Sequence, residues 1–383
     1  MPNFSTGKRI NRTTAVCYFA IVVIFAVFKL LAHFEVFSSF SFVGKELLSA
    51  FMQVGILFAL AFGVMALSTK RKPLEIFRFY GFKKISLAGI LLSILIGVVV
   101  YILNVYVSSF FNMFLESVGY NFSKSAEPTS YPVWLLLVNI LTTAILPAIC
   151  EETSHRGMVL NGASARYKRS RAIIISSVLF GLLHCNIEQF FYATLIGFLL
   201  GYLASVMENI YPCIIIHFMN NFLSVFMGFS RFHKLGADYL FTYTNQFLQN
   251  NALLGLLFVI ILVVLLFFLL KLLVHVLFKK TILKQFEGLN NKVLTEISKM
   301  DYVQDFDSII KTGDIYRPTE FQDYARFKAL YYVYGKEYGF TSELKQTIGD
   351  EPPARDKIAT AFYVTSFVIL SALTIFSFVW GVI

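Results

Sequence analysis

The sequence predicts an all-α fold: a polytopic transmembrane helical bundle of about nine spans, with a small cytoplasmic segment before the last span. Of its 383 residues, 57% are hydrophobic and only 15% are charged, whereas a soluble globule carries about 25% charged residues. The mean hydropathy is +0.68. Apolar runs long enough to cross about 30 Å of hydrocarbon recur along the chain. Much of the surface must therefore face lipid.

The nine spans are predicted from the apolar runs in chain order. The first follows a basic start and, at about 20 residues, is too long for the core of a cleaved signal peptide, so we expect it to be retained. The full-length runs are 13–32, 49–68, 87–107, 132–150, 190–206, 212–228, 251–278 and 358–382. A shorter run, 172–185, lies between the fourth and fifth of these.

Basic clusters predict the orientation of the spans. The net charge of +10 is concentrated in short clusters between apolar runs, such as Lys70 to Lys72 and Lys83 to Lys84. Lys and Arg gather on the cytoplasmic side of membrane proteins. If the N-terminus is cytoplasmic and the C-terminus extracytoplasmic, nearly all the clusters lie on the cytoplasmic side, in the loops 69–86, 161–171, 207–211 and 279–357. We therefore expect a multi-pass protein of the cell membrane, and no nucleic acid partner.

Five parts of the chain differ in character. Residues 1–131 hold the N-terminal spans, and residues 132–228 hold spans with polar interruptions. Residues 229–278 give an extracytoplasmic loop and the eighth span. In 279–357 about a third of the residues are charged, which predicts a cytoplasmic segment. Residues 358–383 form the last span.

Three polar interruptions mark the spans of 132–228. If the fourth span continues as helix to about Ala163, Glu151 lies about 18 Å from its inner edge, and His184 lies about 18 Å beyond the cytoplasmic start of its own span. Glu151 is followed by Glu152 and, four residues after that, by Arg156, and these two share a helical face and can pair. His217 and Asn221 lie about 8 and 14 Å beyond Pro212. Singly, such residues also occur as interfacial charges or interhelical hydrogen-bonding groups. Ionisable groups are costly at membrane depth. Because three separate segments each place such groups at a similar depth, we expect a functional site there.

A carboxylate, two imidazoles and an amide kept from bulk water suit the hydrolysis of an amide bond. The carboxylate takes a proton from water with help from one imidazole. The second imidazole and the amide stabilise the oxyanion. Glu and His are also zinc ligands, although the HExxH signature is absent.

The order and spacing of these motifs also match a known family. EExxxR, FxxxH and HxxxN follow one another on successive membrane segments, and this pattern resembles the CAAX-protease and bacteriocin-processing (CPBP) family, which includes the type II CAAX prenyl endopeptidases. The resemblance covers about 132–228. The matching positions are Glu151, Glu152 and Arg156; Phe180 and His184; and His217 and Asn221.

The resemblance implies an intramembrane endopeptidase. Glu151 with His184 would activate water, and His217 with Asn221 would form the oxyanion site. The implied substrate is a membrane-associated or lipidated peptide or protein, with membrane lipid around it. The implied cofactor is one zinc ion on Glu151, His184 and His217, or none if the enzyme is glutamate-dependent. The supporting residues would be Glu152, Arg156 and Phe180.

Other interpretations of the sequence stay open. His155 stands where the family has a bulky apolar residue, either as a neutral substitution or as an added proton carrier or metal ligand. A transporter, a non-catalytic immunity or scaffold protein, and a Cys-His protease using Cys185 or Cys150 are the alternatives. The Phe-rich single chain, with 42 phenylalanines, predicts a bacterial origin.

Overall fold

The computed structural model describes residues 4–121, 130–167, 169–286 and 356–382, and all regular structure in these ranges is helical. Most of the predicted segment 279–357 lies outside the described residues. The α-helices are α1 (Phe4–His33), α2 (Phe42–Phe51), α3 (Ala61–Thr69), α4 (Pro73–Phe79), α5 (Leu87–Ser117), α6 (Val133–Asn139), α7 (Leu146–Glu152), α8 (Asn161–Ser164), α9 (Arg169–Leu183), α10 (Ile187–Met207), α11 (Tyr211–His233), α12 (Tyr239–Asn250), α13 (Ala252–Phe286) and α18 (Lys357–Val382). The π-helical segments are η1 (Met52–Leu60), η2 (Ile140–Ile145) and η3 (Thr153–Leu160).

The predicted bundle of membrane-spanning helices is confirmed. Within the described ranges, eight helices are long and apolar enough to cross a membrane, and Ser170–Leu183 is a shorter apolar helix. Three helices extend well beyond the predicted runs, because the spans observed are Phe42–Thr69, Leu87–Ser117 and Val133–Ser164. The last of these continues past the predicted end at residue 150. The helix that begins at Val133 continues through the charged motif as α7, η3 and α8. This continuation agrees with the expected depth of Glu151 in the membrane.

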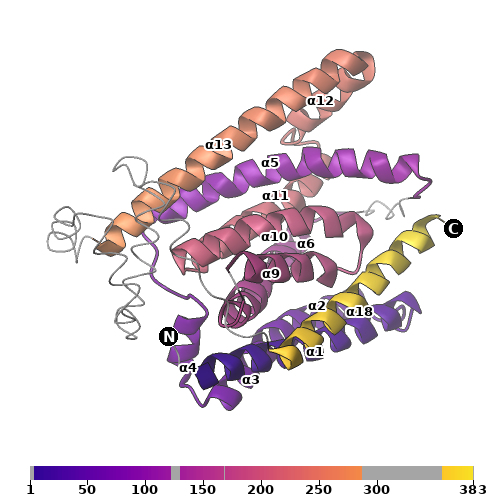
Figure 1. The fold of residues 1–383 in the computed structure, drawn as a ribbon. Helices are drawn as coiled ribbons and strands as arrows, with labels where there is room; N and C mark the ends of the chain where they lie inside the picture. Colours follow the sequence, from indigo (N-terminus) through magenta and orange to yellow (C-terminus); the bar gives the residue numbers. More distant parts are fainter. Residues whose placement is uncertain (1–3, 122–129, 168, 287–355, 383) are drawn as a thin grey trace.

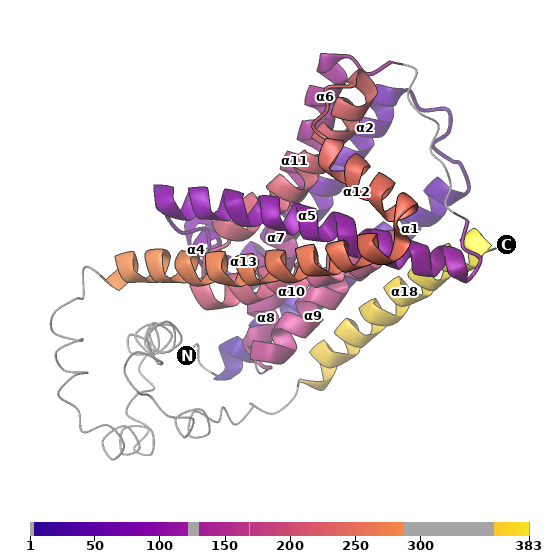
Figure 2. The same ribbon diagram turned by 90° about the horizontal axis from the view of Figure 1, so that it is seen from above.

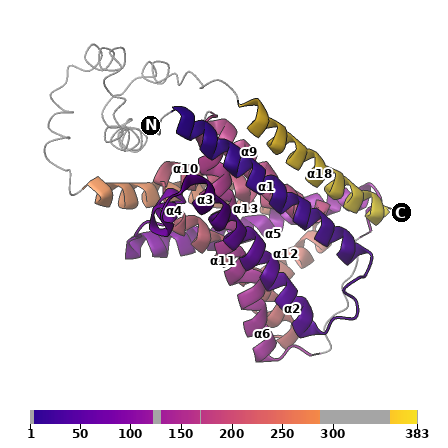
Figure 3. The ribbon, with the colours of Figure 1, turned by 90° about the horizontal axis from the view of Figure 1, so that it is seen from below.

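The helices form three layers (Figure 1). One outer layer contains α5 and α13, which run along each other (Figure 2). The other outer layer contains α1 to α3 and α18, and here α1 and α18 lie side by side although they come from opposite ends of the chain (Figure 3). An ion pair of 2.8 Å joins Arg12 of α1 to Asp356, the residue just before α18. Between the outer layers lie α9 and α10, with α11 beside them.

Two apolar clusters hold the layers together. One contains buried side chains of α1, α3, η3, α9 and α18. The other contains buried side chains of α5, α10, α11 and α13. Cys150 and Leu183, the sequence neighbours of Glu151 and His184, belong to the first cluster, and Ile216, the neighbour of His217, belongs to the second.

Small residues let α9 and α10 pack closely as an antiparallel hairpin. Gly197 faces the backbone of Ser177, where an added Cβ would meet the Ser177 Cα at 3.1 Å. Gly181 faces α10 in the same way, and a Cβ there would meet the Phe190 carbonyl oxygen at 2.8 Å. Close contact between helices in lipid depends on such small residues.

Gly181→Ala is expected to destabilise the protein by about 1–3 kcal/mol, because the methyl group would push the rigid backbone of α10 away. The measurement is unfolding in mixed micelles, followed by circular dichroism. Gly63→Ala is the matched control, because nothing lies within 4 Å of a Cβ at Gly63. Equal stability of the two variants would contradict the tight hairpin.

Candidate active site

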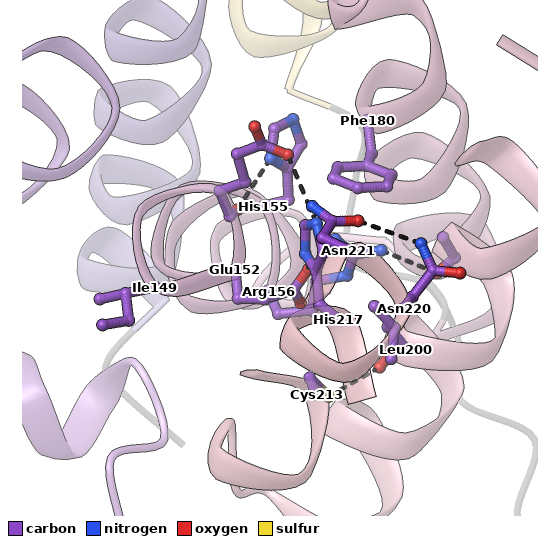
Figure 4. Close-up of polar contacts among 12 residues, drawn as sticks. Ile149, Glu152, His155, Arg156, Phe180, Leu200, Cys213, His217, Asn220 and Asn221 are labelled. Carbon is purple, nitrogen blue, oxygen red and sulfur yellow. Dashed lines mark hydrogen bonds and ion pairs between the residues drawn. The ribbon is translucent and has the colours of Figure 1, made fainter. Parts of the chain in front are cut away.

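Five residues of the three sequence motifs lie close together in the bundle (Figure 4): Glu152, Arg156, Phe180, His217 and Asn221. Glu151 and Glu152 end α7, and Arg156 follows in η3. Phe180 lies near the end of α9, with His184 in the turn that follows. His217 and Asn221 lie on α11. Segments that are distant in the sequence thus contribute to a single polar site.

Glu152 is the buried centre of this site. Its Oε1 accepts hydrogen bonds of 2.9 Å from Arg156 Nη1 and 2.9 Å from His217 Nδ1. The side chains of Glu152 and Arg156 are completely buried. Burial of two opposite charges requires good geometry and further hydrogen bonds, and here Arg156 Nη2 also donates to the Gly197 carbonyl at 3.1 Å. Arg156 therefore ties α10 to the carboxylate that orients His217.

Glu151 approaches the same imidazole from its other side. Its Oε2 lies 3.9 Å from His217 Nε2. Its Oε1 accepts a hydrogen bond of 3.0 Å from Gln53 Nε2 in η1. The Glu151 side chain keeps 12% of its surface exposed, whereas that of Glu152 keeps none. Glu151 is therefore the motif carboxylate that water and a ligand can reach.

Hydrogen bonds also settle which ring nitrogens carry protons. A carbonyl oxygen can only accept, so His184 Nδ1 donates to the Phe180 carbonyl at 3.1 Å. His217 Nδ1 donates to the Glu152 carboxylate. In the neutral ring of His184, Nε2 therefore carries a lone pair. In the part of the chain that is described, the His184 side chain makes no other hydrogen bond, which leaves its Nε2 available to a ligand.

Phe180 separates the polar groups of the site. Its ring stands nearly perpendicular to the rings of His155, His184 and His217, with centroid distances of 5.1, 5.4 and 5.7 Å. The Arg156 guanidinium lies 4.3 Å from the ring centroid, which is a favourable cation–π geometry. Phe180 thus holds the arginine and the three imidazoles apart by packing rather than by hydrogen bonding.

Asn221 belongs to a chain of side-chain amides. Asn104 Nδ2 donates to Asn220 Oδ1 at 3.2 Å, and Asn220 Nδ2 donates to Asn221 Oδ1 at 3.0 Å. Asn221 Nδ2 then donates to the Thr143 carbonyl in η2 at 3.0 Å. An amide nitrogen has two N–H groups, so one donor of Asn221 remains for a ligand. The chain of amides fixes the direction in which that donor points.

His155 has both ring nitrogens engaged by the protein. Nδ1 lies 2.9 Å from the Glu151 carbonyl oxygen, and Nε2 lies 3.1 Å from the Tyr18 hydroxyl. The residue is fully buried. Neither nitrogen is therefore free to bind a metal or a substrate, and the contact with Tyr18 links η3 to α1.

The expected zinc ligands do not form a metal site in this geometry. Across the described ranges, no group of three or more His, Cys, Asp or Glu side chains is placed to hold a metal ion. Two of the expected donor atoms, Glu151 Oε2 and His217 Nε2, lie 3.9 Å apart.

Three partners of the site were missed from the sequence: Tyr18, Gln53 and Asn104. Gln53 and Asn104 are polar residues within long apolar runs, and that interruption is the signal that could have identified them. Tyr18 gives no such signal, because tyrosine is common in membrane helices. Its role depends on the packing of α1 against η3.

Comparison with known proteins identifies part of the chain. Residues 132–223 match the family model described as type II CAAX prenyl endopeptidase Rce1-like. No curated protein and no solved structure gives a significant match. The matched range begins one residue before α6 and ends within α11, so it contains every residue of the three motifs. Residues 132–223 are therefore similar to the type II CAAX prenyl endopeptidase Rce1-like family, and the other helices of this multi-pass bundle lie outside the match.

Proposed function

We propose that this protein is an intramembrane endopeptidase that hydrolyses a peptide bond of a membrane-associated peptide or protein. The observation that carries the proposal is the placement of His217 between two carboxylates, with Glu152 at Nδ1 and the more accessible Glu151 3.9 Å from Nε2. A buried, oriented imidazole beside an accessible carboxylate suits proton transfer. The match to a protease family supports the same chemistry.

Glu151 is the proposed general base. Water attacks the carbonyl carbon of the scissile bond while its proton passes to the Glu151 carboxylate. The lone pair of His184 Nε2 accepts a hydrogen bond from the same water and orients it. When the intermediate collapses, Glu151 returns the proton to the leaving nitrogen, so that the C–N bond breaks to give a carboxylic acid and an amine.

His217 and Asn221 are the proposed oxyanion donors. Asn221 supplies its remaining N–H, which the amide chain directs. His217 donates from Nε2 as the imidazolium, whose Nδ1–H is held by Glu152. Donors fixed in place before the reaction stabilise the developing charge without reorganisation. Glu152, Arg156 and Phe180 are positioning residues in this scheme.

His184→Ala is expected to lower the rate of peptide cleavage by about 10²–10⁴-fold, because it removes the group that orients and activates the water. The measurement is the appearance of cleavage products from a library of hydrophobic peptides incubated with the protein in lipid vesicles, followed by mass spectrometry. His275→Ala is the matched control, because His275 is an exposed histidine on α13.

Two outcomes would overturn this scheme. Full activity of His184→Ala would remove His184 from the mechanism. Zinc bound at one ion per protein, and lost when His184 or His217 is replaced, would show a metal-dependent enzyme instead.

A further inference from the structure

A cavity of about 630 Å³ lies beside the turn that carries His184. Cys185 and Asn186 of this turn line it, so the cavity begins one residue away from the proposed catalytic histidine. Lys29 of α1 and Trp380 of α18 also line it. These two helices lie outside the matched range 132–223, so the cavity is formed by the domain together with helices added to it. Its volume is within the range of ligand-binding pockets, about 300–1,000 Å³.

Lys29 gives the cavity a positive charge. No described residue forms an ion pair with this lysine. The ammonium group is close enough to His184 and Cys185 to influence both electrostatically. A lysine near the end of a membrane helix commonly extends toward lipid headgroups. That common arrangement does not explain why Lys29 lines a cavity beside the turn that carries His184.

The rest of the wall combines aromatic rings with a few hydrogen-bonding groups. His33 packs edge to face against Trp380 and Phe376, with centroid distances of 4.8 and 5.2 Å. Among the described residues, Glu188 is the one carboxylate in the cavity wall, and it accepts a hydrogen bond of 3.0 Å from the Tyr120 hydroxyl. Burial and this bond raise the pKa of Tyr120 to about 12, so the hydroxyl keeps its proton and remains a donor to Glu188. Lys29 is therefore the charge left for a ligand.

We propose that this cavity is a substrate subsite, in which Lys29 binds a carboxylate of a hydrophobic peptide while the peptide chain passes the α9–α10 turn to reach His184. An ammonium–carboxylate contact flanked by aromatic rings is stronger than one in water, because the surroundings are less polar. The carboxylate comes either from the C-terminus of the peptide or from an acidic side chain. The assignment as a subsite depends on the proposed function, whereas binding of the carboxylate does not.

Cys185 provides a reporter for the test. It lines the cavity and is half-buried, whereas Cys17, Cys150 and Cys213 are buried. The experiment measures the rate at which N-ethylmaleimide alkylates the full-length protein in lipid nanodiscs at pH 7. Cys185→Ser identifies the signal of this thiol. Increasing concentrations of three acetylated peptides are added: Leu-Leu-Phe with a free carboxylate, its C-terminal amide, and Leu-Glu-Phe amide.

The expected result is that a carboxylate peptide protects Cys185 at a concentration at least about tenfold lower than Leu-Leu-Phe amide. Protection by the free acid alone indicates a terminal carboxylate, and protection by Leu-Glu-Phe amide indicates a side-chain carboxylate. Lys29→Met removes the advantage of the carboxylate peptide, and Lys29→Arg retains it. Lys271→Met, a change at an exposed lysine of α13, behaves as the wild type.

Equal protection by the acid and amide peptides, or no protection by any of them, would overturn the proposal. So would an unchanged preference in Lys29→Met. The same measurements are made on Glu151→Gln, in which the proposed cleavage is blocked. If protection persists but the wild type cleaves no peptide, peptide hydrolysis is wrong and the carboxylate-binding cavity stands.

Discussion

Glu151→Gln is expected to lower kcat for peptide cleavage by about 10³–10⁴-fold with little change in KM. Glutamine has nearly the same shape as glutamate, and its amide oxygen can still accept the hydrogen bond from Gln53. What it loses is the ability to take a proton from water, and a positioned general base typically contributes about 10²–10⁴-fold. A change confined to kcat indicates an interaction made only in the transition state. Initial rates at several peptide concentrations in vesicles separate kcat from KM.

The control for this prediction is a carboxylate outside the site. Glu116 lies at the exposed end of α5, so Glu116→Gln makes the same chemical change without touching the site. Its kcat is expected to equal that of the wild type. A wild-type kcat in Glu151→Gln would contradict the assignment of Glu151 as the base. An equal loss of kcat in both variants would point to damage by overexpression or purification.

The helices were predictable wherever hydrophobicity alone determines them. The observed span Leu87–Ser117 begins at the predicted residue, and Leu253–Thr281 covers almost the predicted run. The run 132–150 ended at its first charges, whereas the helix continues to Ser164 because Glu152 and Arg156 pair along it. The pairing of α1 with α18 gives no local signal, since it joins residues that are more than 300 positions apart.

The composition of the site was easier to predict than its internal contacts. Glu152 and Arg156 are four residues apart, a spacing that places them on one helical face, and the two side chains meet at 2.9 Å. The partner of His217 was not predictable, because the choice between Glu151 and Glu152 depends on how α7 turns against α11. Two π-helical segments, η2 and η3, lie on either side of α7. Such segments shift side chains away from their α-helical positions and are frequent at functional sites, but the sequence does not reveal them.

Arg156→Met is expected to lower the free energy of unfolding by about 3–5 kcal/mol. Methionine replaces most of the volume but none of the charge, so the Glu152 carboxylate stays completely buried without its arginine. An unpaired buried charge is far more costly than an unpaired charge in water. The measurement is unfolding in mixed micelles of increasing detergent strength, followed by circular dichroism. Lys83→Met is the control, because it breaks the exposed pair with Glu208 and should change stability by less than about 1 kcal/mol.

A second substitution shows whether Arg156→Met loses stability because the Glu152 charge is unpaired or because packing is lost. Adding Glu152→Gln to Arg156→Met removes the unpaired carboxylate and is expected to recover much of the lost stability, as buried ion pairs replaced by neutral groups often do. The double variant is expected to stay inactive, because His217 then has no charged partner at Nδ1. If it is as unstable as Arg156→Met alone, the loss comes from packing around Phe180 and Gly197. Recovered stability without activity would mean that the chief role of Arg156 is electrostatic. Its positive charge would stabilise the buried, ionised Glu152 carboxylate that contacts His217.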